Sequence, residues 1–154
     1  MVLESDYFFM GLAIEEAEKA YRLAEVPVGA VLVGADGQIL SRAHNKPISS
    51  NDPTAHAEIL AIRGASEKLG NYRLPETVMY VTLEPCAMCV GAMLHARVKR
   101  LVFGAGDPRS GAAGSVLDLT GVGRFNHRIE VAGGVLAANC AEILHIFFKE
   151  RRAG

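Results

Sequence analysis

The chain reads His56-Ala57-Glu58 and, about one helix and one strand later, Pro85-Cys86-Ala87-Met88-Cys89. One imidazole and two thiolates are ligands that Zn²⁺ prefers, and three protein ligands leave the fourth tetrahedral position open for water. An open position is typical of a catalytic zinc, whereas a structural zinc usually has four protein ligands. Glu58 lies two residues after the histidine, where its carboxylate can carry protons. We therefore expect one zinc ion per subunit, bound by His56, Cys86 and Cys89, with Glu58 as the catalytic residue.

Two other interpretations of these residues are weaker. A Cys-x-x-Cys pair alone could be a redox pair, but the preceding proline and the upstream His-x-Glu favour zinc. A structural zinc would need a fourth ligand, for which His44 and His95 are the nearest candidates in the sequence. The third cysteine, Cys140, lies in an apolar, helical-looking stretch and is expected to be a small buried core residue.

The length and composition predict one domain over residues 1–154. Half of the residues are apolar, which provides a core without disulfides. No apolar run reaches the roughly 18 residues that a membrane span needs, and residues 1–6 have neither the basic segment nor the cleavage site of a signal peptide. Three cysteines, two of them spaced as metal ligands, suit a reducing compartment, so we expect a cytoplasmic protein with no membrane association.

The net charge of −1 does not by itself indicate a nucleic-acid-binding protein, but the charges are unevenly distributed. Residues 1–94 hold 7 Lys and Arg against 12 Asp and Glu, whereas residues 95–154 hold 9 against 5. This asymmetry permits a basic face built from the C-terminal part of the chain. Ordinary solvated charges would give the same count.

Apolar periodicity and turn residues predict an α/β domain with one sheet covered by helices on both faces, a three-layer α/β/α arrangement. Ser5 is a plausible cap for the first helix, Asp52 or Thr54 for the second, and Asp36-Gly37 marks a hairpin turn. Gly70-Asn71 ends the second helix. Helices are expected over residues 6–24, from about 52–54 to 69, 85–96 and 136–151, and strands over residues 28–33, 38–43, 77–83, 100–103 and 128–131.

The predicted helices constrain where the metal lies. Cys86 and Cys89 fall at the start of one helix, where exposed N–H groups and the helix dipole favour thiolates. His56 falls at the start of another, and residues two apart do not share a helix face. His56 and Glu58 can therefore address one water molecule only if the metal lies beyond the helix end. We expect two helix N-termini to converge on one ion.

The metal motif is shared by deaminases of free cytidine, cytosine, deoxycytidylate, guanine and tRNA adenosine, and its spacing does not choose among them. From about residue 7 to residue 152, however, the chain resembles the bacterial tRNA-specific adenosine deaminases of the cytidine/deoxycytidylate deaminase superfamily. The loop over residues 104–115 and Asn126-His127-Arg128 are the matches most specific to the tRNA enzymes. The other matches are residues 26–33, 45–48, 52–59, 80–89, 91–93, 102–103 and 147–148.

This resemblance implies a five-stranded mixed sheet flanked by helices, as in cytidine deaminases, usually in a homodimer. It also implies a zinc-dependent hydrolase that converts adenosine to inosine at the wobble position of tRNA and releases ammonia. The partner would be the tRNA anticodon stem-loop, with the target base flipped into the zinc pocket.

The resemblance also assigns substrate-binding residues. Asn45 would lie near the target nucleotide, Ala57 is also among the substrate-binding residues, and Asp107 would lie near a ribose hydroxyl. Phe148, Arg151 and Arg152 would belong to a C-terminal helix beside the RNA. One of Phe147 and Phe148 should pack into the core instead, because adjacent helical residues point about 100° apart.

Two alternatives to an RNA-editing enzyme remain. One is a deaminase of a free base such as guanine or cytosine. The other is a non-catalytic partner in an editing complex, which ranks last because such proteins typically lose the glutamate that is present here as Glu58.

Overall fold

Strand β3 (Val78–Leu83) lies at the centre of a five-stranded sheet in the computed structural model of the chain, which describes residues 1–153. The strand order is β2-β1-β3-β4-β5. Strand β1 (Gly29–Val33) is antiparallel to both β2 (Ile39–His44) and β3, whereas β4 (Arg100–Ala105) and β5 (Glu130–Ala132) continue the sheet in parallel. The sheet is therefore mixed, as expected.

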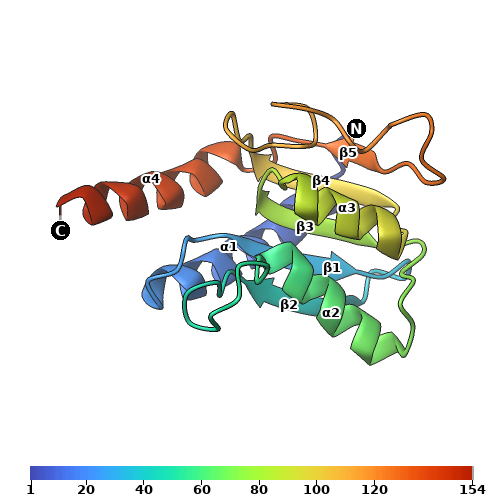
Figure 1. Cartoon of the computed structure of the whole chain (residues 1–154), viewed down its shortest axis with the longest axis horizontal. Coiled ribbons are helices and arrows are strands. Elements are labelled where there is room, and N and C mark those ends of the chain that lie inside the picture. Colours follow the sequence, from blue (N-terminus) through green and yellow to red (C-terminus); the bar gives the residue numbers. More distant parts are fainter. Residues whose placement is uncertain (154) are drawn as a thin grey trace.

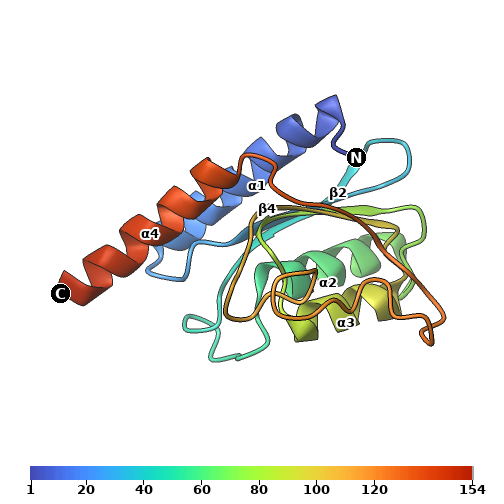
Figure 2. The same cartoon turned by 90° about the horizontal axis from the view of Figure 1, so that it is seen from above.

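Helices cover both faces of the sheet and make three layers (Figure 1). Helices α1 (Glu4–Arg22) and α4 (Ala137–Ala153) lie on one face, and α2 (Ala57–Leu69) and α3 (Ala87–Ala96) lie on the other (Figure 2). The C-terminal half of α4 extends past the ends of the strands, beside the end of α1 (Figure 2). The expected α/β/α architecture is confirmed.

The side chains of the central strands alternate between two apolar cores. In β3, Met79 and Val81 pack with α2 and α3, while Tyr80 packs on the side of α1 and α4. In β1, Leu32 belongs to the first core and Val31 to the second. All five residues of β1 are buried, because successive residues of a strand point to opposite faces and both faces are covered.

Two of the expected helix caps are wrong. Helix α1 begins at Glu4, before the expected cap Ser5, and the carboxylate of Asp6 accepts a hydrogen bond from the N–H of Leu3 at 2.7 Å. Helix α2 begins later than expected, with His56 as its N-cap. The side chain of Asp52 instead accepts hydrogen bonds from the N–H and hydroxyl of Thr54, and so closes a turn before the helix.

The turn signals in the sequence are confirmed. Between β1 and β2, Gly37 has a φ of +81° and donates its N–H to the carbonyl of Gly34. At the end of α2, Gly70 has a φ of +64°, the left-handed conformation of a helix C-terminus. In the part of the chain that the structure describes, no helix is long and apolar enough to cross a membrane.

Candidate active site

His56, Cys86 and Cys89 meet at one point, with their ligand atoms within 4.8 Å of one another. Nδ1 of His56 lies 3.7 Å from Sγ of Cys86 and 3.5 Å from Sγ of Cys89. A tetrahedral zinc ion with ordinary bond lengths separates a nitrogen and a sulfur ligand by about 3.6 Å. The three side chains therefore fit a zinc ion in both chemistry and spacing, with Nδ1 as the imidazole ligand.

The ligands come from two helix N-termini. His56 is the N-cap of α2 and Cys86 is the N-cap of α3, while Cys89 lies in the first turn of α3. Neither cap residue uses its side chain to hydrogen-bond its own helix, so both side chains are free to turn toward the metal position. The expected convergence of two helix ends is confirmed.

The short distances among the three ligand side chains shift their pKa values. The pKa of the Cys86 thiol is lowered, first by a hydrogen bond from Cys89 and then by one from His56. The pKa of Cys89 is raised by its hydrogen bond to Cys86 and by burial. The hydrogen bond to Cys86 also raises the pKa of His56. Negative charge therefore already gathers on Cys86, and a bound cation favours ionisation of the second thiol as well.

Glu58 is buried in the first turn of α2, two residues after His56. Burial raises the pKa of Glu58 to about 7, and the positive charge of His56 offsets only part of that effect. A carboxyl group with a pKa near neutrality exchanges a proton readily in both directions, which suits a general acid and base. Its position beside the metal ligands agrees with the role expected from the sequence.

Asn45 and Ala57 lie together next to this centre. Asn45 follows β2 and is 8% exposed, and its side-chain oxygen accepts a hydrogen bond from the N–H of Ala57 at 2.8 Å. Ala57 is the first residue of α2, between His56 and Glu58. These two expected substrate-binding residues therefore border the metal site directly.

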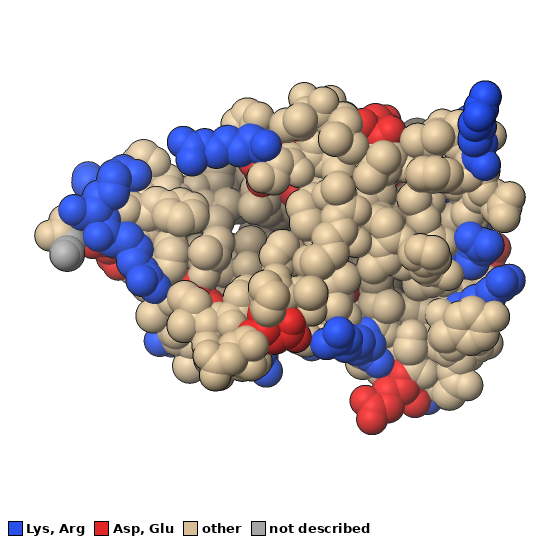
Figure 3. All heavy atoms as spheres, in the orientation of Figure 1, with Lys and Arg blue, Asp and Glu red and all other residues tan. Residues whose placement is uncertain are grey.

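Asp107, Phe148 and Arg152 border a separate hollow of about 720 Å³ between α4 and the loop after β4. Figure 3 shows the molecule hollowed beside α4, with Lys and Arg side chains over the end of that helix. Phe148 is 44% exposed there, while Phe147 is buried, which confirms that only one of the pair packs into the core. The other lining residues are Val26, Leu83, residues 105–106, 108–110, Ala141, Leu144 and His145.

Arg151 does not line this hollow. Its guanidinium donates a hydrogen bond to the carbonyl of Ala24 and lies 4.7 Å from the ring centroid of Phe147. One residue earlier on α4, both carboxylate oxygens of Glu150 accept the hydroxyl of Tyr21 of α1. Arg151 is therefore directed toward α1, whereas Arg152 is directed toward the hollow.

Comparison with known proteins agrees with this site. Residues 3–105 match the cytidine and deoxycytidylate deaminase zinc-binding region. The chain is 50% identical over 149 residues to the tRNA-specific adenosine deaminase of Haemophilus influenzae, covering 97% of this chain and 86% of that protein. It is 47% identical to the Bacillus subtilis protein of the same name, covering 97% and 92%. The chain belongs to the tRNA-specific adenosine deaminase family.

Solved structures show the same fold. A structure from studies of A-to-I editing by tRNA:A34 deaminases matches with a TM-score of 0.85 and 47% identity, covering 89% of this chain and 99% of that one. The guanine deaminase of Nitrosomonas europaea matches with a TM-score of 0.81 at 26% identity, covering 96% and 86%. The five-stranded sheet described above is therefore that of the deaminase family.

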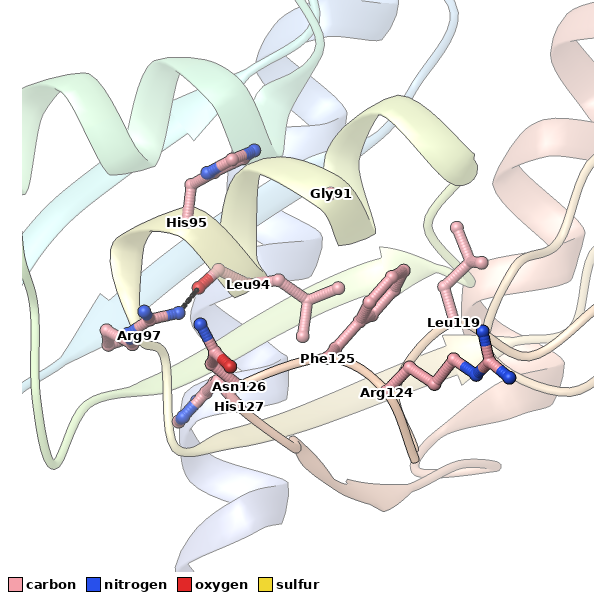
Figure 4. Close-up of a pocket in the computed structure, with 9 residues that line it drawn as sticks. All are labelled: Gly91, Leu94, His95, Arg97, Leu119, Arg124, Phe125, Asn126 and His127. Atoms are coloured by element: carbon pink, nitrogen blue, oxygen red, sulfur yellow. Dashed lines mark hydrogen bonds between the residues drawn. The ribbon is translucent and has the colours of Figure 1, made fainter. Parts of the chain in front are cut away.

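The segment Asn126-His127-Arg128, part of the sequence resemblance, lies away from the hollow that Asp107 borders. Asn126 and His127 border a second hollow of about 400 Å³, between α3 and residues 119–127 (Figure 4). His127 donates a ring N–H to the carbonyl of Val98 at 2.7 Å, which ties this segment to the connection between α3 and β4. Neither the metal ligands nor the expected substrate-binding residues border this second hollow.

One buried carboxylate near the metal, within the matched segment 80–89, received no role from the sequence. Glu84 follows the apolar strand β3, lies two residues before Cys86 and is 2% exposed. In the sequence, Glu84 could have been noticed as a charged residue between a predicted buried strand and a metal ligand. Its partners lie in the glycine-rich loop after β4.

Proposed function

We propose that this protein hydrolyses adenosine to inosine at the wobble position of tRNA, with one zinc ion per subunit, and that residues 1–154 form a single domain carrying this activity. The observation that carries the proposal is the meeting of His56, Cys86 and Cys89 at two helix N-termini with Glu58 buried beside them. In the reaction, the oxygen of water replaces the exocyclic amine of adenine, and the amine leaves as ammonia.

The residues divide the chemistry among them. A zinc ion held by the three ligands supplies a Lewis acid that makes water ionise near neutral pH. Glu58 accepts the proton from the attacking water and delivers it to the ring nitrogen of the adenine. The same carboxylate then takes the second proton, from the hydroxyl group added at C6, and passes it to the departing amine, which leaves as ammonia. Its burial keeps it out of bulk solvent, so these protons pass within the site.

Substrate binding is assigned to the groups around the metal and the hollow. Asn45 and Ala57 border the flipped base, and Asp107 lies near a ribose hydroxyl of the anticodon loop. Phe148 offers an exposed aromatic face for stacking, and Arg152 offers a cation for a phosphate. Arg151 supports the RNA surface indirectly: its guanidinium is directed toward α1 and helps to hold α4 in place.

Similarity and shape both favour RNA over a free base. The chain is 43–50% identical to tRNA-specific adenosine deaminases but 26% and 32% identical to the guanine deaminases of Nitrosomonas europaea and Bacillus subtilis. In addition, the hollow beside α4 has room for a nucleotide next to the target, which a free-base deaminase does not need. We further propose a homodimer acting in the cytoplasm, where tRNA is found, and light scattering of the purified protein tests the dimer.

The direct test uses the zinc-loaded protein and a tRNA anticodon stem-loop with adenosine at the wobble position. Nuclease digestion and mass spectrometry should find inosine at that position only, and a stem-loop with guanosine there is the matched control. Free guanine and cytosine are assayed in parallel for ammonia. Ammonia from a free base without inosine in RNA would favour the free-base alternative and overturn the proposal.

A further inference from the structure

The loop over residues 106–115 is long and makes almost no regular secondary structure, yet it borders the hollow beside α4. Its one ladder contact is an isolated antiparallel bridge from Ala113 to Asp118, just beyond the loop. Peptide N–H groups in such a segment must find acceptors elsewhere, because unpaired buried N–H groups are costly. The acceptor for several of them is a single side chain, Glu84.

The carboxylate of Glu84 is enclosed by this loop. Its Oε1 accepts the N–H of Asp107 at 3.0 Å and the hydroxyl of Ser115. Its Oε2 accepts the N–H groups of Ala113 and Ser115, both at 3.0 Å. One ionised group thus ties the two ends of the loop together, and hydrogen bonds to a charged acceptor are stronger than those between neutral groups.

Gly111 shows how closely the loop encloses this carboxylate. A Cβ atom at Gly111 would lie closer than 3.0 Å to the carboxylate carbon of Glu84 and to the carbonyl oxygen of Asp107. Real Cβ atoms essentially never approach other atoms so closely. The absence of a side chain at Gly111 is therefore a condition for the contact between loop and carboxylate.

The same carboxylate connects the hollow to the metal centre. Glu84 is two residues before the zinc ligand Cys86, and its own N–H donates to the carbonyl of Ala105 at the end of β4. On the other side, Asp107 is bound through its backbone to Glu84, while its side chain accepts the N–H groups of Arg109 and Ser110. Glu84, which follows β3 and precedes Cys86, thus fixes the orientation of residues 107–110 toward the hollow.

We propose that Glu84 is a positioning residue that holds residues 107–110 in register with the zinc site, so that an RNA loop seated in the hollow presents its base at the metal. This inference rests on the proposed function. It assigns to Glu84 a role in RNA affinity that is separate from metal binding, because none of its hydrogen bonds is made to His56, Cys86 or Cys89.

The test compares Glu84→Gln with the wild-type protein, both loaded with zinc. Glutamine has nearly the same shape, but one of its two oxygens is replaced by a donor that faces N–H groups. We expect the Kd for the wobble-adenosine stem-loop, measured by fluorescence anisotropy, to rise at least tenfold. KM should rise with it, while kcat falls much less and zinc content stays at one per chain. Amide exchange at residues 107, 113 and 115 should become faster.

Asp6→Asn is the matched control for loss of a buried carboxylate. Asp6 pairs with Arg100 at the start of β4, whereas the loop follows the other end of that strand. It should lower stability without changing the Kd for RNA. Gly111→Ala disturbs the same contact from the loop side, so its effect on Kd should be markedly less than additive with that of Glu84→Gln.

Ser115→Ala provides a milder variant, which removes only the hydroxyl contact, should Glu84→Gln fail to fold. It should raise the Kd several-fold and leave the zinc content unchanged. Unchanged RNA affinity in folded Glu84→Gln or Ser115→Ala would overturn the inference, as would loss of zinc in step with loss of affinity. If the wild-type protein binds the stem-loop without forming inosine, the proposed function fails, whereas the role of Glu84 in affinity is still decided by the anisotropy.

Discussion

The side-chain oxygen of Asn45 accepts the backbone N–H of Ala57, at 2.8 Å, between the zinc ligand His56 and the buried carboxyl group of Glu58. The backbone of Asn45 is itself hydrogen-bonded to the residue that precedes β1, since its N–H donates to the carbonyl of Val28 at 3.1 Å. The start of α2, and with it two of the four central residues, is therefore held against the sheet by one amide.

Asn45→Ala should lower both stability and activity, because it leaves the buried N–H of Ala57 without an acceptor. We expect a loss of about 1–3 kcal/mol in the free energy of unfolding and a drop in kcat/KM of roughly tenfold or more. Asn45→Asp keeps an acceptor for Ala57 but loses the amide donor. Recovery of stability without recovery of activity in Asn45→Asp would assign the donor to the substrate. Wild-type behaviour of Asn45→Ala would contradict this role for the amide.

Glu58→Gln should lower turnover strongly without removing the metal. The glutamine fills the same buried space but cannot accept and release a proton, so kcat should fall by about 10²- to 10⁴-fold. Zinc content, measured by elemental analysis, should stay at one per chain, because Glu58 is not among the three ligands. Turnover close to that of the wild-type protein would show that another group transfers the proton.

The three cysteines should respond differently to substitution. Cys86→Ser or Cys89→Ser should reduce bound zinc well below one per chain and lower the melting temperature, since metal binding contributes to folding stability. Cys140→Ala is the control, because this buried thiol packs beside Gly104 and lies in the core on the other face of the sheet. It should keep its zinc. Equal zinc loss in all three variants would argue against the ligand assignment.

The pair Asp6 and Arg100 should make stability depend on pH in the acid range. Burial alone would raise the pKa of Asp6, but hydrogen bonds from Arg100, from the N–H of Leu3 and from Tyr80 outweigh burial, and the pKa lies below its usual value. A lowered pKa stabilises the folded state above the unfolded value of about 3.9. This contribution is lost as the pH falls through the folded pKa.

Urea unfolding of the wild-type protein and Asp6→Asn measures this contribution. At pH 7 the variant should be less stable by about 3–5 kcal/mol, because it leaves the largely buried Arg100 without its partner. The difference between the two proteins should shrink below about pH 4. A difference that stays constant down to pH 3 would contradict the lowered pKa.

The neighbouring arginines of α4 should behave as two different kinds of residue. Arg152 borders the hollow, so Arg152→Ala should weaken RNA binding and reduce the slope of log K against log salt by about 1. Arg151 is bonded to Ala24 and stacked on Phe147, so Arg151→Ala should chiefly loosen α4. Its effect should therefore appear as faster amide exchange in α4, with an unchanged salt slope. Identical salt slopes for both variants would remove this distinction.

The amino-acid sequence by itself determined the metal-ligand set and the layers, and it predicted Glu58 as the proton carrier. His56, Cys86 and Cys89 are recognisable because the donor types and the short spacing Pro-Cys-x-x-Cys are local properties of the chain. The strands are recognisable because apolar runs bounded by turn residues are local too. Gly37 in the β1–β2 turn and Gly70 at the end of α2 both have the positive φ that glycine favours.

Only the tertiary structure decided how α2 begins and how the loop after β4 is held. The N-cap of α2 is His56 and not Asp52 or Thr54 as predicted, because the Asp52 side chain accepts the N–H of Thr54 in the preceding turn. Glu84 meets Asp107, Ala113 and Ser115 across 23 to 31 residues of sequence. Such contacts depend on which peptide groups remain unpaired after the sheet and helices have formed, and a local sequence pattern carries no record of that.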